Sequence, residues 1–417
     1  MEFLACMDWQ KAQEMIAQAV TTVAEEEGVE LLAATGRVTA AAILAQEDLP
    51  PFARSTVDGY AVRSADTFGA SEAAAALLEV VGDIHMGRAA GFALEPGQAA
   101  VIPTGGMLPM GADAVVMMEY AEQPDGRTLL VQKKAAPNEN VLTKGEDVAC
   151  GAVLVEKGVR LDARHIGLLA ACGCQEVLVR KRLKVGLISS GDELVEIGVQ
   201  PTGGQVRDVN SYALSALLSG CGCEVERFGI IKDSYEQFCE CLNRAAATCQ
   251  LVLISGGSSV GARDFTVPAL QAVAKPGILF HGLAIKPGKP TIFAMAQDVP
   301  VFGLPGHPVA AFMVCGQLVA PAVRRLGGER QAPAVRGVPA VLSRNLASAP
   351  GRDDFISVRL LAQDGGYVAE PILGKSGLIG VLAQADGVLH IPSAKSGLYQ
   401  GDPVMIQPVT AGTEGGA

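Results

Sequence analysis

The 417-residue sequence lacks several patterns that identify common classes of protein. Aromatic residues make up only 5% of the chain, and none of the ten cysteines forms a C-x-x-C pair, so neither a zinc knuckle nor a thioredoxin-like site is expected. The sequence shows no run of about 18 apolar residues and no basic N-terminal region, so we expect neither a membrane span nor a secretory signal. These absences favour a protein of the reducing cytoplasm.

Other absences restrict the chemistry. The chain has neither a G-x-G-x-x-G fingerprint nor a G-K-[ST] phosphate loop, which disfavours hydride transfer and P-loop hydrolysis. Its 33 Lys and Arg face 44 Asp and Glu, giving a net charge of −11, so a nucleic-acid binder is disfavoured. The five histidines are scattered, which argues against a histidine-based triad. Apolar residues are abundant, at 49%, and with the length of the chain they indicate a folded protein of two to four domains. The 49 glycines indicate many turns.

The pattern changes four times along the chain. Residues 10–27 predict an amphipathic helix closed by Gly28. From 52 to 140, short apolar runs alternate with Gly, Pro and Asp turns, which predicts a small β domain. Residues 141–182 predict a strand pair and a short helix. Strands and helices then alternate to about residue 328, which predicts a mostly parallel sheet with helices on both faces, and the remainder reads as all-β. The predicted fold class is therefore multidomain α/β plus β.

The predicted parallel sheet places several loops at one edge, where open α/β sheets bind ligands. The run Ser255 to Asp264 follows a buried strand and offers backbone amides and hydroxyls to an anion, although a flexible turn is the alternative. Asp192 and Glu193 follow one strand, Asp233 follows another, and together with Asp264 they suit a hard cation such as Mg²⁺. Each of these carboxylates, taken alone, is also typical of a helix cap.

Two further segments suit an anion. Lys286-Pro287-Gly288-Lys289-Pro290 places two lysines on a backbone restricted by proline, with a solvated turn as the alternative. Pro305-Gly306-His307 leads into a helix whose free amides form a second platform, and His307 is itself more typical of a cap or packed side chain than of proton transfer.

Two motifs outside this region fit no catalytic template. The first is PPFARSTVDGYA, from Pro50 to Ala61, and the second is Lys144-Gly145-Glu146-Asp147. The sequence leaves open whether the second is structural or ligand-facing.

Nine segments in order resemble the molybdopterin molybdenumtransferases, which insert molybdate in the last step of molybdenum cofactor synthesis. They run from about residue 50 to 313 and read PPFARSTVDGYAV, IPTGGMLPMGADAVVMMEY, KGEDVACGAVL, LISSGDELVEIG, GQVRDVNSYAL, GIIKDSYE, ISGGSSVGARDFT, AIKPGKPTIFA and LPGHPVAAF. Nine collinear motifs make the resemblance specific.

The resemblance implies four domains, one of them discontinuous. The expected boundaries are 1–50 and 141–182 for an elongated N-terminal domain, 51–140 for an inserted β-rich domain, 183–328 for a molybdopterin-binding α/β domain and 329–417 for a C-terminal β-barrel. The resemblance also implies a homodimer in which the inserted domain of one subunit faces the α/β domain of the other.

The activity implied is Mg²⁺-dependent molybdenum insertion into adenylylated molybdopterin, with release of AMP. The resemblance makes catalytic candidates of Asp58, Thr104, Lys144, Asp147, Glu193, Asp233, Asp264, Lys286 and Lys289. Asp233 and Asp264 are the candidate metal ligands, and the sequence leaves open which carboxylate binds Mg²⁺ and which orients the nucleophile. The segments that would bind the substrate contribute Ser190, Gly191, Asp192, Gly256, Gly257, Ser258, Ser259, Gly261, Pro305, Gly306 and His307. A molybdopterin adenylyltransferase and maturation proteins of the apo-molybdoenzymes are the expected partners.

Three positions depart from the family pattern and reduce local positive charge: Leu142 before the KGED motif, Gly282, and His307 in place of asparagine in PGNP. Other interpretations are a non-catalytic molybdopterin-binding or scaffolding homologue, a tungstate-inserting variant, and an adenylyltransferase. Retention of the carboxylates favours the enzyme, and the KGED and DGYA motifs favour insertion over adenylylation.

Overall fold

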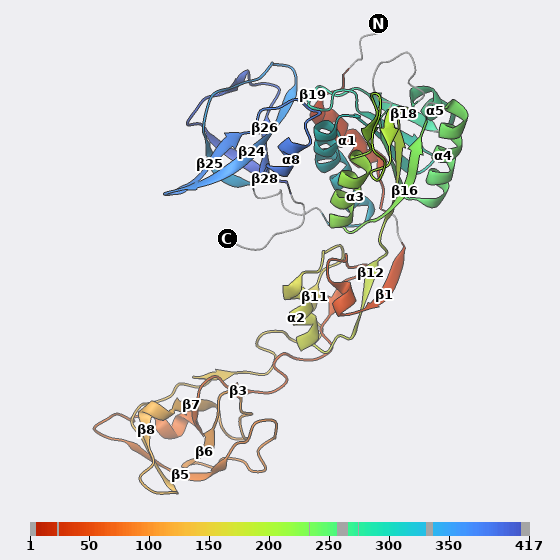
Figure 1. Ribbon diagram of the computed structural model, residues 1–417. Helices are drawn as coiled ribbons and strands as arrows, with labels where there is room; N and C mark the ends of the chain where they lie inside the picture. The colour runs from red at the N-terminus through yellow and green to blue at the C-terminus, as the bar shows by residue number, and fades with distance from the viewer. Residues whose placement is uncertain are drawn as a thin grey trace.

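The computed structural model describes residues 6–22, 25–232, 234–256, 266–273, 275–330 and 337–409. It is elongated (Figure 1). An α/β body and a barrel lie together at one end, a small middle body follows, and a β-rich distal body lies at the other end. The chain begins in the α/β body with α1, passes outward through the middle body to the distal body, and returns through the middle body before β13. The multidomain α/β plus β fold is confirmed.

Helix α1 (Trp9–Ala19) is shorter than the predicted helix over residues 10–27. Asp8 caps it, accepting hydrogen bonds from the amides of the next turn, but the chain is extended at Val20. Residues Glu26–Glu30 form strand β1, in which Gly28 lies opposite Leu178 of a strand far along the chain. The prediction that Gly28 closes a helix is wrong because this distant partner overrides the local pattern.

The middle body is assembled from two separate segments of the chain. Strand β1 pairs with β12 (Glu176–Arg180), and β2 (Ile43–Leu44) pairs with β11 (Val153–Val155), both antiparallel. Short helix η1 (Leu32–Ala34) and α2 (Ala163–Ala171) complete it. Its small core contains Ala34, Val155, Leu161, Leu169, Val177 and Val179.

The start of α2 is fixed by a capping box. The Asp162 carboxylate accepts from the amides of Arg164 and His165, and His165 Nδ1 accepts from the Asp162 amide at 3.1 Å. Hydrogen bonding to Arg164 holds the pKa of Asp162 well below its usual range. We expect Asp162→Ala to destabilise α2 by about 1 kcal/mol, because the first-turn amides lose their acceptor.

Hydrogen exchange of the α2 amides at pH 7 measures this effect locally. Asp125→Ala, at an exposed turn of the distal body, is the control for a general effect of losing a carboxylate. Equal exchange of the α2 amides in Asp162→Ala and the unmodified chain would contradict the prediction.

The distal body is the predicted small β domain. Its six-stranded sheet has the order β7-β4-β6-β5-β9-β8, with apolar clusters on both faces. The strands are β4 (Gly59–Val62), β5 (Ala76–Asp83), β6 (Gln98–Ile102), β7 (Ala114–Met117), β8 (Ala121–Glu122) and β9 (Thr128–Val131), with short helices η2 (Ser64–Thr67) and η3 (Met118–Tyr120). A separate pair, β3 (Arg54–Ser55) with β10 (Val141–Leu142), lies where the chain enters and leaves this body.

The α/β body has a six-stranded sheet in the order β16-β13-β17-β21-β20-β18. The first four strands are parallel to one another, and β20 and β18 extend the sheet in antiparallel fashion. The strands are β13 (Lys184–Ser190), β16 (Glu224–Ile231), β17 (Leu251–Ser255), β18 (Pro276–His281), β20 (Ile292–Ala296) and β21 (Val299–Leu304), beside a small pair β14 (Leu194–Val195) and β15 (Val206–Arg207).

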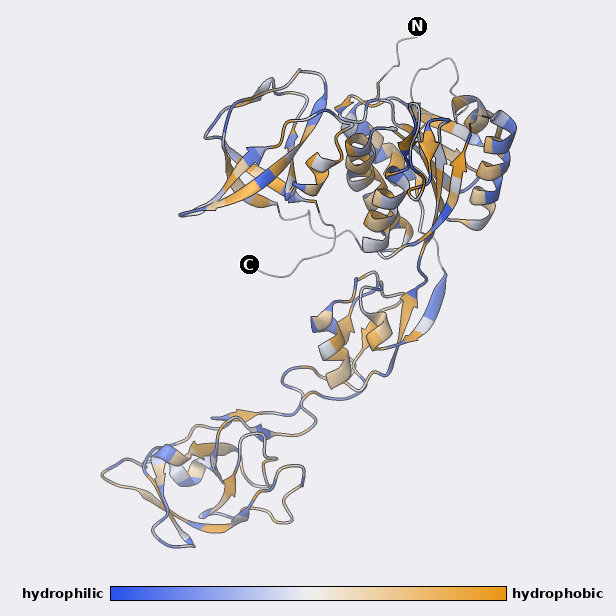
Figure 2. Cartoon of the chain, in the orientation of Figure 1, coloured by the Kyte–Doolittle hydropathy of each residue, from blue (hydrophilic) through white to orange (hydrophobic). Residues whose placement is uncertain are grey.

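Helices cover both faces of this sheet, as the sequence predicts. α4 (Tyr235–Thr248) and α5 (Thr266–Val273) pack on one face, while α1, α3 (Asn210–Gly220), α6 (Pro308–Val314) and α7 (Ala320–Leu326) bury the other. Figure 2 shows hydrophobic residues filling the sheet and hydrophilic residues on the outer sides of the helices.

One helical run, Pro308–Leu326, is long and apolar enough to cross a membrane by length and composition. It comprises α6, a π-helical turn η4 (Cys315–Val319) and α7. Two thirds of its most apolar window, 67%, is buried inside the protein, and its side chains belong to the main core of the α/β body. The high hydropathy of this run is therefore explained by its burial as a core helix.

The C-terminal body is a closed barrel of five strands. Strand order β24-β25-β22-β28-β26 returns to β24, which closes the ring. The strands are β22 (Val338–Leu342), β24 (Asp353–Gln363), β25 (Gly366–Pro371), β26 (Gly387–Ile391) and β28 (Pro403–Pro408), with a small pair β23 (Leu346–Ala347) and β27 (Gly397–Leu398) and the short helix α8 (Gly380–Ala383). Strand β19 (Ile285–Lys286) of the α/β body adds to β24 in parallel and joins the two bodies.

Candidate active site

A cleft of about 1830 Å³ lies between the α/β body and the barrel. Its floor is formed by the carboxyl ends of β13, β17 and β21, which is the edge of the sheet at which the sequence places the ligand loops. The segment 283–290 and the first turn of α6 form its sides, and segments 345–347, 351–357 and 372–381 of the barrel face them. A cavity of this size accommodates a ligand larger than a single mononucleotide.

The ends of β13 and β17 meet closely at Gly256. This residue has φ of +96°, and a Cβ built on it would lie 2.2 Å from the Ser190 carbonyl oxygen. Only glycine fits without movement of the backbone. The predicted binding residues Ser190 and Gly256 both line the cleft. They can lie in contact because Gly256 has no side chain.

Asn210 ties two of the strand ends together. Its buried amide nitrogen donates to Ser255 Oγ and to the Gly306 carbonyl oxygen, both at 2.9 Å. Asn210 is the first residue of α3, and the sequence alone gives it no role in the site. Nearby, buried Asp208 accepts from Ser189 Oγ at 2.6 Å and from the Ser211 amide at 3.1 Å. This carboxylate lines the cleft but already has two donors from the protein.

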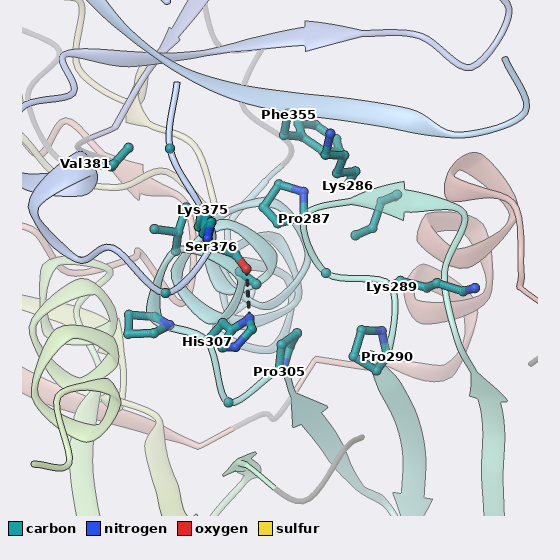
Figure 3. Close-up of a pocket in the computed structure, with 18 of the residues that line it drawn as sticks. Lys286, Pro287, Lys289, Pro290, Pro305, His307, Phe355, Lys375, Ser376 and Val381 are labelled. Atoms are coloured by element: carbon teal, nitrogen blue, oxygen red, sulfur yellow. Dashed lines mark hydrogen bonds between the residues drawn. The ribbon is translucent and has the colours of Figure 1, made fainter. Parts of the chain in front are cut away.

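The two predicted lysines both line the cleft (Figure 3). Gly288 between them has φ of +118°, and a Cβ there would lie 2.5 Å from Val314 of α6, so the turn packs tightly against the helix. The Lys289 carbonyl oxygen accepts from the Leu283 amide at 2.8 Å. The backbone of the loop is thus fixed, while the side chains of Lys286 and Lys289 are exposed.

The barrel contributes polar residues that sequence reasoning missed. Arg352, Lys375 and Ser376 line the cleft, and Arg352 Nε donates to Asp354 at 2.9 Å. Pairing of β19 with β24 sets Lys286 opposite Asp354, so the strand pairing fixes the position of this part of the barrel relative to the lysine loop. No local pattern reveals such a contact, because it depends on packing between bodies.

The candidate ligands of the predicted metal site lie outside the described part of the chain. Asp233, Asp264, Gly257, Ser258, Ser259 and Gly261 lie outside the described residues. Glu193 lines the cleft, whereas Asp192 does not, although its carbonyl oxygen accepts from Lys232 Nζ at 3.0 Å. Gly191 does not line the cleft, and a Cβ on it would meet the Glu193 carboxylate. The described residues contain no cluster of three His, Cys, Asp or Glu suited to a metal.

Four predicted catalytic residues lie far from the cleft of their own chain. Asp58 and Thr104 belong to the distal body, and Lys144 and Asp147 to its junction with the middle body (Figure 1). Asp58 Oδ1 accepts from the Thr104 amide at 2.7 Å and from its hydroxyl at 3.1 Å. Sequence reasoning therefore found two groups of residues, and one chain does not bring them together.

The two unexplained motifs turn out to be neighbours. β3 pairs with β10, and Leu49 forms a bridge with Val148, so PPFARSTVDGYA and KGED run side by side. Lys144 Nζ lies 3.4 Å from Asp48, and a hydrogen bond from the Cys150 amide is the main reason that the pKa of Asp48 is lowered. These contacts give the junction a structural role.

Comparison with known proteins covers nearly the whole chain. Residues 7–173 match the "MoeA N-terminal region (domain I and II)", 186–325 a "Probable molybdopterin binding domain" and 339–409 the "MoeA C-terminal region (domain IV)". A Haemophilus influenzae protein named "Molybdopterin molybdenumtransferase" is 34% identical over 388 residues, which cover 92% of this chain and 94% of that protein. The chain belongs to the MoeA family.

Other MoeA relatives also match nearly the whole chain. A Nostoc protein with the same name is 34% identical over 389 residues, covering 92% of this chain and 88% of that protein. A solved MoeA structure from Pyrococcus horikoshii OT3, described as a molybdopterin biosynthesis protein, matches with a TM-score of 0.84 and 31% identity over 96% of this chain and 99% of that one. The MoeA fold therefore extends through all the bodies described above.

Proposed function

We propose that this MoeA protein is a molybdopterin molybdenumtransferase that inserts molybdenum into adenylylated molybdopterin and releases AMP. The observation that carries the proposal is the cleft at the carboxyl ends of β13, β17 and β21, lined by two lysines within the region that matches a molybdopterin-binding domain. The names of the relatives support the same activity.

The residues of the cleft suit cleavage of a link between two phosphates. Negative charge increases on the non-bridging oxygens in the transition state, and fixed cations stabilise it most effectively when they are already in place. The rigid turn around Gly288 positions Lys286 and Lys289 for this role. The N-terminal end of the α6 dipole adds partial positive charge. Mg²⁺, when bound, would neutralise substrate charge, with Asp233 and Asp264 proposed as its ligands.

We further propose that the enzyme is a homodimer whose active site is shared between subunits. Asp58 and Thr104 lie at the opposite end of the chain from the cleft, so they contribute to catalysis only if a second subunit presents them. In this proposal the Thr104 side chain, fixed by Asp58, faces the partner's cleft, and Lys144 and Asp147 lie beside it. The exposure of Asp58 and Thr104 is compatible with this role.

The proposed cellular setting is the cytoplasm, with a molybdopterin adenylyltransferase supplying the substrate and apo-molybdoenzyme maturation proteins receiving the product. The five segments expected from the resemblance, which form four domains, are retained as part of this proposal. Tungstate, a tetrahedral dianion like molybdate, is the alternative metal substrate.

Purified protein mixed with adenylylated molybdopterin, Mg²⁺ and molybdate tests the activity. AMP release together with active cofactor supports insertion. Binding of molybdopterin without AMP release indicates the scaffolding alternative, and adenylylation from ATP indicates the adenylyltransferase. Replacing molybdate with tungstate identifies the preferred oxyanion.

Lys286→Ala and Lys289→Ala are each expected to weaken substrate binding by about 1.5–3 kcal/mol, because each loses a charged hydrogen bond to a phosphate oxygen. The loss should shrink as salt is raised, because both side chains are exposed. Equilibrium binding at low salt measures it, with Lys395→Ala in an exposed barrel turn outside the cleft as the matched control. Affinity equal to that of the control in both cleft variants would remove these lysines from the site.

A further inference from the structure

The barrel segment 373–379 forms one wall of the cleft, and little packing holds it there. It connects β25 to α8. Every residue from 373 to 383, all within the described chain, is exposed or half-buried, and Leu373 and Leu378 are 62% and 53% exposed. A segment with so little burial relies on hydrogen bonds to keep its position.

Among the described residues, Ser376 makes the two hydrogen bonds that tie this segment to the α/β body. The Val309 amide, in the first turn of α6, donates to the Ser376 carbonyl oxygen at 3.0 Å. The Ser376 hydroxyl oxygen lies 2.8 Å from His307 Nδ1 (Figure 3). Within the described chain, the other hydrogen bonds of the segment are local, such as that from the Leu378 amide to the Lys375 carbonyl oxygen.

His307 occupies the N-cap position of α6, yet its imidazole is directed at Ser376 rather than at the helix amides. The usual capping side chains bond to the first-turn amides. Here the backbone of Ser376 already satisfies Val309, which leaves the imidazole available to bridge to the barrel. His307 is therefore the side chain through which the α/β body holds segment 373–379.

The position of this segment determines where Lys375 lies. Lys375 directly precedes Ser376 and lines the same cleft as Lys286 and Lys289, and Figure 3 shows Lys375 and Ser376 next to His307. The side chain of Lys375 is exposed, so its placement follows from that of its backbone. Loss of the His307–Ser376 contact would allow this cation to move away from the cleft.

We propose that His307 is a positioning residue for the transfer reaction, holding segment 373–379 against α6 through the Ser376 hydroxyl and so keeping Lys375 on the wall that receives the anionic substrate. The part of the inference that concerns catalysis rests on the proposed function. The part that concerns the position of the segment does not, so the two are tested separately.

Hydrogen exchange by mass spectrometry tests the holding role on the full chain. In His307→Ala, the amides of Val309 and Leu378, which the position of this segment protects, are expected to exchange about five- to tenfold faster, the effect of one lost hydrogen bond. Ser376→Ala should match it, and the double variant should exchange no faster than either single variant, because both remove the same contact. Ser396→Ala, at an exposed barrel serine outside the cleft, is the control and should leave exchange of these amides unchanged.

The catalytic role is tested by a split between KM and kcat. In His307→Ala the KM for adenylylated molybdopterin is expected to rise about tenfold, as for one lost charged contact, with kcat changed by less than about threefold. His307→Asn should restore both KM and the slow exchange of the Val309 and Leu378 amides, because its amide reaches the position of Nδ1.

Unchanged exchange in His307→Ala, additive effects in the double variant, or no recovery in His307→Asn would overturn the inference. Faster exchange with an unchanged KM would overturn its catalytic part. A wild-type protein that releases no AMP would contradict the proposed function instead, and the exchange data would still decide whether His307 holds the segment.

Discussion

An Asp58→Asn homodimer and a Lys286→Ala/Lys289→Ala homodimer are each expected to be nearly inactive, whereas a mixture of the two should regain about a quarter of wild-type activity. Asp58 lies in the distal body and the lysines line the cleft, so each cleft of the proposed dimer takes the two groups from different subunits. Random exchange makes half of the dimers mixed, and each mixed dimer contains one cleft with both defects and one with neither. AMP release after subunit exchange measures the recovery.

The matched control mixes Asp58→Asn with Thr104→Ala. Both changes lie in the distal body, where the two residues are hydrogen-bonded to each other, so every cleft of a mixed dimer keeps one defect and no recovery is expected. Native mass spectrometry confirms that exchange has occurred. If the lysine mixture then stays as inactive as this control, the cross-subunit site is wrong.

Gly256→Ala is expected to abolish AMP release and to lower the stability of the α/β body by about 2–4 kcal/mol. A left-handed backbone costs a residue with a side chain about 1–3 kcal/mol, and the new Cβ, 2.2 Å from the Ser190 carbonyl oxygen, forces the ends of β13 and β17 apart. The floor of the cleft would then lose its shape. Hydrogen exchange of the β13 and β17 amides at increasing urea concentration measures the stability of the α/β body. AMP release measures the function.

Gly198→Ala provides the control for this variant. Gly198 lies in an exposed loop where a Cβ would have nothing within 4 Å, so stability and activity should stay close to wild type. Wild-type stability and turnover in Gly256→Ala would show that the two strand ends separate without consequence, contrary to their assigned role in shaping the site.

Local sequence predicts those helices and strands whose own residue types determine their structure. Strand β17 lies where the sequence predicts a buried strand before the run from Ser255, because five consecutive apolar or small residues are followed by glycine. Helix α6 begins at Pro308, directly after the segment predicted to lead into a helix, because proline suits a first turn. The two lysines line the cleft on a turn whose backbone the sequence predicts to be restricted by prolines and glycine. The edge of the sheet was also predicted, since parallel strands separated by helices end on the same side.

The sequence does not predict pairings that depend on distant residues. The sequence of β1 is typical of the end of a helix, because its partner β12 lies far along the chain. Two-residue strands such as β3 are too short to show an alternation of apolar and polar residues. The contact of Ser376 with His307 depends on how the barrel packs on the α/β body, which no local pattern encodes. For the same reason no local signal of Asp58 or Lys286 shows that the two lie far apart in one chain, and only the family resemblance implies it.

Pairing of β1 with β12 also has a consequence for the order of events during synthesis. Glu26 and Arg180, which form an ion pair across these strands, are 154 residues apart, so at about 5–20 residues per second the ribosome makes the second roughly 8–30 seconds after the first. All residues of the distal body are made within that interval. Once folded, that body brings Leu49 and Val148 together, and the chain that the middle body must close becomes much shorter. The inserted segment that separates the two halves of the middle body in sequence thereby helps them to meet.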